Sequence, residues 1–219
     1  MHFDLSRTET HDAYNLLIGL VVPRPIALIT SMDGEGRLNA APFSAYNYLT
    51  TEPPIVAIGV QNRPGQPMVG KDTAQNIRQR GEFVINVVNE SIAEAMNVCA
   101  VDFPQGINEL EKAGLTTAPS QVVAVPRIAQ APAALECREF QTIEVEHSRI
   151  ILGRVVAMYV DDRYVDPAGP YIRSEEMHAI GWMNGRGAYV RTRDAFFQMP
   201  RQTIQDWEKS HGPVPKPQN

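Results

Sequence analysis

Two clusters of polar residues in the N-terminal third of the chain carry groups that could bind a small anionic ligand. They are NAAPFSAYN (39–47) and KDTAQN (71–76). The second cluster starts a predicted helix, so free backbone N–H groups, the Thr73 hydroxyl and the Lys71 ammonium would lie together, a combination suited to a phosphate. Asp72 would repel a phosphate, so we expect it to cap the helix or to accept a hydrogen bond from the ligand.

The first cluster suits a flat ring. Ala40 and Ala41 keep bulky side chains away, so a ring could approach the strand and bond to its backbone, with Ser44 and Asn47 adding polar contacts. Taken singly, each cluster also has a simpler interpretation: residues 71–76 as a surface helix N-terminus and residues 39–47 as a strand end with turn-forming side chains. Spacing alone favours these simpler interpretations.

Other motifs do not supply a better catalytic centre. GQPMVGKD (65–72) nearly matches the phosphate loop of nucleoside triphosphatases, but Asp72 stands where a Ser or Thr hydroxyl must ligate magnesium. None of the five histidines is at metal-ligand spacing from another His or Cys. His147 and His178 lie in or near late predicted strands and could reach a pocket, although a lone histidine is more often structural.

The elements around the two clusters are mostly strands. An apolar run, the turn DGEG (33–36) and a second extended run predict a β-hairpin, and IVAIGV (55–60) predicts a third strand after Pro53-Pro54. Further strands are expected at FVINVV (83–88), VVAV (122–125), 132–148 and 149–160. No strand-helix-strand rhythm repeats, which favours an antiparallel barrel over a doubly wound sheet.

Helices are predicted as insertions between these strands. The first begins at Asp72 or Thr73 as cap and ends at Gly81; the second covers 89–100, with Ile92, Ala95, Met96 and Cys99 on one face. ELEKAG (109–114) predicts a third, short and exposed helix. We expect one domain over 1–205 and a mobile, proline-rich C-terminal tail over 206–219.

Composition excludes several classes of protein. A net charge of −5 gives no electrostatic footprint for nucleic acid. The start of the chain lacks the basic and apolar regions of a signal peptide, and no apolar stretch is long enough for a membrane helix. Cys99 and Cys137 are expected to be reduced and buried. Together these features predict a cytoplasmic globular protein.

The order of motifs carries more information than any single one. RPIALITS, NAAPFSAYN, EPPIVAIGV, KDTAQNI and GEFVINVVN follow one another, and GLTTAPS, SEEMHAIGWMNGRGAYVRT and FFQMP come later. This order resembles the flavin reductase-like family of FMN-binding split-barrel proteins, in the branch of flavoredoxin-like proteins and reductase partners of two-component monooxygenases. The resemblance spans about Val22 to Pro200 and implies a six-stranded antiparallel Greek-key split barrel, mainly β with helical insertions.

The resemblance also implies a homodimer with non-covalent FMN at the subunit boundary. Carried over by position, Arg24, Lys71 and Thr73 are expected near the phosphate. The expected activity is hydride transfer from NADH or NADPH to the flavin, which in turn could supply a partner oxygenase; the alternative is an FMN-binding electron carrier with no nicotinamide oxidation of its own. The residues expected near the ring and ribityl chain are Thr30, Ser31, Asn39, Ser44 and Asn47, with Asp72 and Asn76 shaping the phosphate-side helix.

One departure from the family pattern affects the second-substrate pocket. Many relatives have an arginine in an Ile-Gly-Arg-Met-Gly-Gly stretch, where this chain has Trp182 between Gly181 and Met183. Arg186 could replace the lost charge, or Trp182 could cover the flavin or the nicotinamide. Tyr189 is retained.

Overall fold

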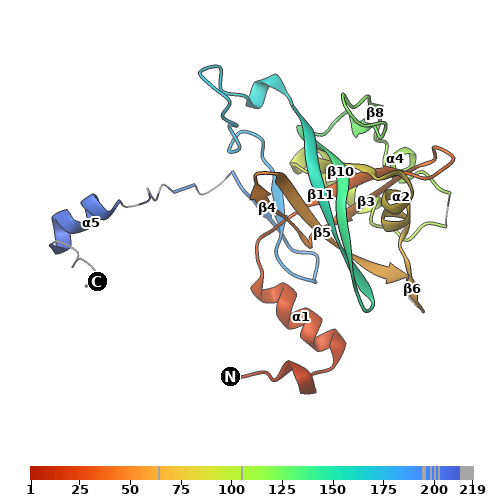
Figure 1. The fold of residues 1–219 in the computed structure, drawn as a ribbon, viewed down its shortest axis with the longest axis horizontal. Helices are drawn as coiled ribbons and strands as arrows, with labels where there is room; N and C mark the ends of the chain where they lie inside the picture. Colours follow the sequence, from red (N-terminus) through yellow and green to blue (C-terminus); the bar gives the residue numbers. More distant parts are fainter. Residues whose placement is uncertain are drawn as a thin grey trace.

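The computed structural model describes residues 1–212 except 64, 105, 194, 195, 198, 200 and 202, and only the backbone of 67 and 68. Its main feature is one antiparallel sheet, with strands in the order β3-β2-β7-β10-β11-β5-β4 and with β6 also paired to β5 (Figure 1). The bounds of these strands are Ala27–Met32 (β2), Leu38–Phe43 (β3), Tyr46–Thr51 (β4), Pro54–Arg63 (β5), Gln66–Gly70 (β6), Glu82–Val87 (β7), Ala133–Val145 (β10) and Ser148–Val160 (β11).

The ladder stays open between β3 and β4, the two ends of the sheet. Next to β4, the backbone N–H of Gly59 in β5 donates to the Ala45 carbonyl at 2.7 Å, which extends the β4–β5 ladder by one residue. Six strands, from β3 to β5 along the ladder, form the barrel wall that the resemblance implies. The predicted mainly β, antiparallel architecture is therefore correct.

The predicted β2–β3 hairpin is confirmed, and its turn is tightly bonded. The Asp33 carboxylate accepts from the backbone N–H groups of Glu35 and Arg37, both at 2.9 Å, and pairs with the Arg37 guanidinium at 2.7 Å. Gly36 has φ +84°, a conformation that a side chain would disfavour.

The two long strands that were predicted form as β10 and β11, which pair as a hairpin, but VVAV (122–125) forms no strand. The Glu136 carboxylate, 3% exposed, accepts instead from the backbone N–H groups of three consecutive residues at 2.7–3.1 Å. These residues are Gln121, Val122 and Val123. Their N–H groups bond a side chain rather than a neighbouring strand, so only the short strands β8 (Thr117–Ala118) and β9 (Arg127–Ile128) form nearby.

Helix α2 (Asp72–Arg80) lies where the first helix was predicted, and Gly81 ends it at φ +69°. The N-cap residue is Lys71 rather than Asp72 or Thr73. The Asp72 carboxylate instead pairs with the Arg63 guanidinium of β5. A nearby cation thus offers the carboxylate a better partner than the helix N–H groups.

The second predicted helix is a 3-10 turn, η2 (Glu90–Ile92), followed by α3 (Ala93–Val98), with Ile92, Met96 and Cys99 buried. α4 (Glu109–Lys112) forms as predicted, but Leu110 is buried in a core cluster, so the helix is not simply exposed. The sequence analysis predicted no helix at α1 (Thr10–Leu20). The 3-10 turns η1 (Leu5–Arg7) and η3 (Asp162–Tyr164) are short connections.

A second, three-stranded sheet joins distant parts of the chain: β1 (Arg24–Pro25), β12 (Ile180–Trp182) and β13 (Tyr189–Arg191). Beyond it, α5 (Ile204–His211) stands apart from the barrel (Figure 1) and has no buried residue. The predicted mobile tail therefore begins inside a helix, and its last seven residues, 213–219, lie outside the described residues. Among the described helices, none is long and apolar enough to cross a membrane.

We predict that Glu136→Gln destabilises the fold by about 2 kcal/mol, because an amide N–H₂ would face N–H donors that the carboxylate now satisfies. Urea unfolding measures the change. Glu94→Gln, at an exposed carboxylate of α3, is the matched control and is expected to be neutral. Equal stability of both variants would show that the carboxylate does not hold this segment.

Candidate functional site

Two pockets meet at the end of β3 and share Pro42, Phe43 and Lys71 in their linings. The α1 pocket, about 570 Å³, lies between α1, β1, the β3–β4 connection and Trp182. The α2 pocket, about 440 Å³, lies between β3, the start of α2 and residues 99–103. Both volumes are in the range of small-molecule sites.

The α2 pocket gathers the donors of the KDT motif. The Thr73 side chain is 1% exposed, and its hydroxyl accepts from the Asn39 amide of β3 at 3.1 Å. No side chain caps α2, so the N–H groups of its first turn remain available to a ligand. The Lys71 ammonium is partly exposed and lies 3.5 Å from the Asp102 carboxylate. This donor set is suited to an anion such as a phosphate.

Three carboxylates line the α2 pocket; Asp102 is exposed and pairs with Lys71, and the other two are compensated within the protein. Asp72 is paired with Arg63. The Glu109 carboxylate accepts from the backbone N–H of Ala40 at 2.9 Å, and burial, with a smaller contribution from the charge of Asp72, raises the pKa of Glu109 above its ordinary value. Sequence analysis missed Glu109 as a site residue, because nothing in ELEK indicates that α4 packs against β3.

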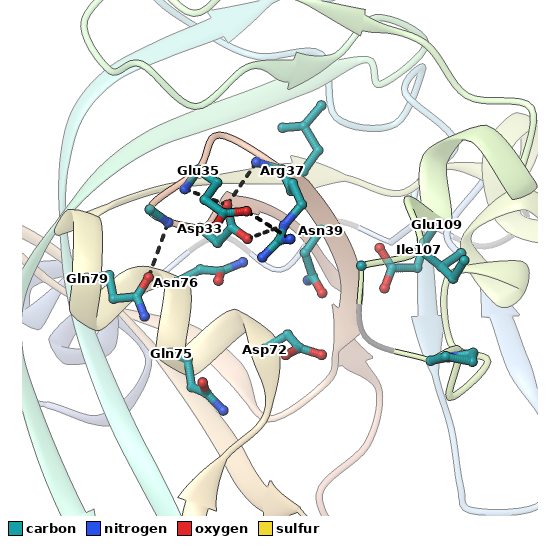
Figure 2. Close-up of a pocket in the computed structure, with 14 residues that line it drawn as sticks. Asp33, Glu35, Arg37, Asn39, Asp72, Gln75, Asn76, Gln79, Ile107 and Glu109 are labelled. Atoms are coloured by element: carbon teal, nitrogen blue, oxygen red, sulfur yellow. Dashed lines mark hydrogen bonds and ion pairs between the residues drawn. The ribbon is translucent and has the colours of Figure 1, made fainter.

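A third, polar pocket of about 300 Å³ adjoins this end of the site, and we call it the hairpin pocket (Figure 2). It lies between the β2–β3 turn, α2 and the residues Pro104, Gly106 and Ile107, and it shares Asn39, Asp72 and Glu109 with the α2 pocket. Asn76 lines it, and the Asn76 amide also donates to the Ser31 hydroxyl at 3.1 Å. Asn76 thus connects the helix to β2, as a residue that shapes the site would.

Arg24 lies in the α1 pocket, away from Thr73. It is 7% exposed, and its guanidinium donates to the carbonyls of Ile18 at 2.6 Å and Val21 at 2.9 Å, and to the Ser44 hydroxyl at 3.3 Å. Of the three residues that were expected together near a phosphate, only Lys71 lines both pockets. Ser44 and Asn47 line the α1 pocket with Arg24.

The remaining candidates lie elsewhere. Thr30 and Ser31 are fully buried in β2 and line none of these three pockets; the Thr30 hydroxyl donates to the Pro126 carbonyl at 2.7 Å. His178 lines a separate pocket beside Asn89, and His147 lies at the β10–β11 turn. Arg186 is exposed, whereas Trp182 lines the α1 pocket. Of the two alternatives, Arg186 as a substitute for the lost charge and Trp182 as a cover for the pocket, the structure brings Trp182 to the α1 pocket.

The side chains of the site offer binding rather than nucleophilic chemistry. Cys99 lines the α2 pocket, but burial raises the pKa of its thiol to about 12, so the thiolate is scarce at neutral pH. Burial also raises the pKa of Tyr46 in the α1 pocket to about 12. Among the described residues there is no cluster of three potential metal ligands. Both cysteines are free and buried, as predicted.

Comparisons of the sequence with known proteins identify the family of this chain. The family described as "Flavin reductase like domain" matches residues 19–180. An uncharacterised protein of Deinococcus radiodurans is 41% identical over 95% of this chain and 92% of its own length. YwrF of Bacillus subtilis, also uncharacterised, is 35% identical over 84% of this chain and 91% of its own length.

Several solved structures have the same fold as this chain. The 2-nitrobenzoate 2-nitroreductase NbaA of Pseudomonas fluorescens is 37% identical, with a TM-score of 0.83 over 92% of this chain and 96% of that one. Component B of the nitrilotriacetate monooxygenase of Bacillus cereus is 30% identical, with a TM-score of 0.84 over 90% and 98%. Flavoredoxin of Desulfovibrio vulgaris, at 20% identity, a TM-score of 0.71 and coverage of 90% and 97%, shares the fold. The family match covers most of the chain, so this protein belongs to the flavin reductase-like family.

Proposed function

We propose that this protein binds FMN in the joined α1 and α2 pockets and transfers hydride from NADH or NADPH to the flavin, as a cytoplasmic homodimer. One observation carries the proposal. The uncapped N-terminus of α2, with Lys71 and Thr73, lies in a pocket that continues along β3 into a mainly apolar one. A charged donor set joined to an apolar pocket fits the phosphate and the ring of one mononucleotide.

Within this proposal, Lys71, Thr73 and the first-turn N–H groups of α2 hold the phosphate. Asn39 fixes the Thr73 hydroxyl through its amide, and the Asp72–Arg63 pair keeps the Asp72 charge from opposing the phosphate. The end of β3, with Ser44 and Asn47 beyond it, positions the ring in the α1 pocket.

FMN, when bound, supplies the hydride acceptor, and the protein contributes orientation and exclusion of water. The apolar residues of α1 and Phe43 cover one side of the α1 pocket and keep water from the ring. No general acid or base is required for hydride transfer, which agrees with the buried, protonated Cys99 and Tyr46.

More than one electron acceptor could oxidise the reduced flavin. The likeness to a monooxygenase component supports delivery to a partner oxygenase, and the likeness to NbaA supports direct reduction of a small acceptor. An electron carrier without nicotinamide oxidation is the rival, because flavoredoxin has the same fold.

We predict that Lys71→Ala combined with Thr73→Ala weakens FMN binding by about 2 to 4 kcal/mol, through loss of two charge-assisted phosphate contacts. Flavin fluorescence titration measures the affinity. Lys112→Ala with Thr116→Ala, at two exposed residues that line none of the three pockets, removes the same number of polar groups and is expected to leave the affinity unchanged. Equal affinity for both double variants would contradict the phosphate assignment.

We also predict that NADH or NADPH bleaches the visible absorbance of the FMN-loaded protein in a stopped-flow instrument, without another protein. Bleaching that requires an added reductase protein would identify an electron carrier instead. The FMN titration is done separately. It shows whether a protein that does not bleach has failed to bind flavin or has failed to oxidise the nicotinamide.

Three exposed apolar side chains before α5 support the dimer. Phe196, Phe197 and Met199 are 60–80% exposed, and large exposed apolar side chains close together in the sequence favour contact with another protein surface. We predict that the full chain is a dimer by light scattering and that a chain ending at Arg191 shifts towards monomer. A truncated chain that remains fully dimeric would place the interface elsewhere.

A further inference from the structure

Arg24 and Trp182 each present a buried N–H group that has no hydrogen-bond partner. The atoms are Nη2 of Arg24 and Nε1 of Trp182. The two residues are paired across β1 and β12, the Arg24 guanidinium lies 4.8 Å from the centre of the Trp182 ring, and both residues line the α1 pocket. Two neighbouring residues of one pocket therefore each carry an unpaired, buried donor.

A buried N–H donor without a partner raises the free energy of the folded protein. For Arg24, the buried positive charge adds to this cost. Its Nη1 and Nε atoms donate to two backbone carbonyls and one hydroxyl, all of them neutral. Within the part of the chain that the structure describes, no carboxylate forms an ion pair with Arg24. A buried cation without a counter-charge is unfavourable, so a ligand that brings a negative charge to Nη2 would be stabilised.

The walls around these donors determine what else the ligand must be. Leu17, Val21, Pro23 and Phe43 line the α1 pocket, and the Trp182 ring forms part of it. Apolar and aromatic walls favour a flat hydrocarbon ring over a hydrated ion, and a few convergent donors fix its orientation. Inorganic phosphate would suit the donors of the α2 pocket better, where the walls are more polar.

We propose that the α1 pocket binds an aromatic carboxylate as the second substrate of the flavin site. The carboxylate accepts from Arg24 Nη2 and Trp182 Nε1, and the ring packs against the apolar wall formed by α1 and Phe43. This assignment rests on the proposed flavin function, because the ring of FMN would share this pocket along β3. A flavin carbonyl could accept from the same donors, but it is neutral and would leave the Arg24 charge uncompensated.

The experiment is a calorimetric titration of the FMN-loaded protein with benzoate, benzamide and cyclohexanecarboxylate. We expect benzoate to bind at least about tenfold more tightly than benzamide, which keeps the ring but lacks the charge. Cyclohexanecarboxylate, which keeps the charge but is not flat, is expected to bind more weakly than benzoate.

Two variants test the donors separately. Trp182→Phe keeps an aromatic ring but loses Nε1–H together with the five-membered ring that carries it, and we expect it to weaken benzoate binding about threefold to tenfold. Arg24→Gln removes the charge and is expected to weaken benzoate about tenfold or more. Tyr171→Phe, which removes one polar hydrogen from an exposed aromatic residue, and Arg191→Gln are the controls outside the pocket. Because Trp182→Phe is conservative, the test remains valid even if Arg24→Gln fails to fold.

Equal binding of benzoate and benzamide, or no binding of either, overturns the proposal. So does a result in which Trp182→Phe weakens FMN but not benzoate, since the donors would then serve the flavin. Flavin affinity is measured separately by fluorescence. If the protein fails to bind FMN, the proposed function fails, whereas benzoate titration of the flavin-free protein still tests the pocket.

Discussion

The pairing register of β3 with β2 is the constraint on which both pockets depend. β3 contributes Asn39 to the α2 pocket and Phe43 to both pockets. A slip of one residue would turn every side chain of β3 to the opposite face. The bonded turn at Asp33 and Gly36 fixes the register, so a surface hairpin determines which side chains line the site.

Arg24 has a comparable role at the other end of the site. Its guanidinium bonds the C-terminal carbonyls of α1 and the Ser44 hydroxyl, and it stacks on Trp182. A cation at a helix C-terminus is favourable, which explains why a buried arginine is tolerated there. One side chain thus holds α1, β1, the β3–β4 connection and β12 around the α1 pocket, while its Nη2 atom has no hydrogen-bond partner.

Local electrostatics in the α2 pocket differ from the net charge of the chain. The protein is acidic overall, yet the carboxylate of Asp72 is paired with Arg63, and burial favours the protonated form of Glu109. A phosphate approaching Lys71 and Thr73 would therefore meet less repulsion than the composition suggests. Net charge excludes nucleic acid as a class of ligand, but it says little about a single pocket.

The sequence by itself determined the β2–β3 hairpin, the two long strands β10 and β11, the strand after Pro54, the helix from Asp72 to Gly81 and the family. Turn residues, β-branched runs and motif order are signals that can be read without the tertiary structure. It also identified the polar clusters 39–47 and 71–76. Only the tertiary structure decided which of those residues line the α1 pocket, which line the α2 pocket and which lie outside both. Arg24 lies in the α1 pocket away from Thr73, Thr30 and Ser31 are buried inside the barrel wall, and Glu109 and α1 complete the pockets from segments with no motif of their own. The physical reason is long-range packing. Strand register decides to which face of the sheet a side chain points, and packing between segments far apart in the sequence decides which carbonyl or carboxylate it contacts.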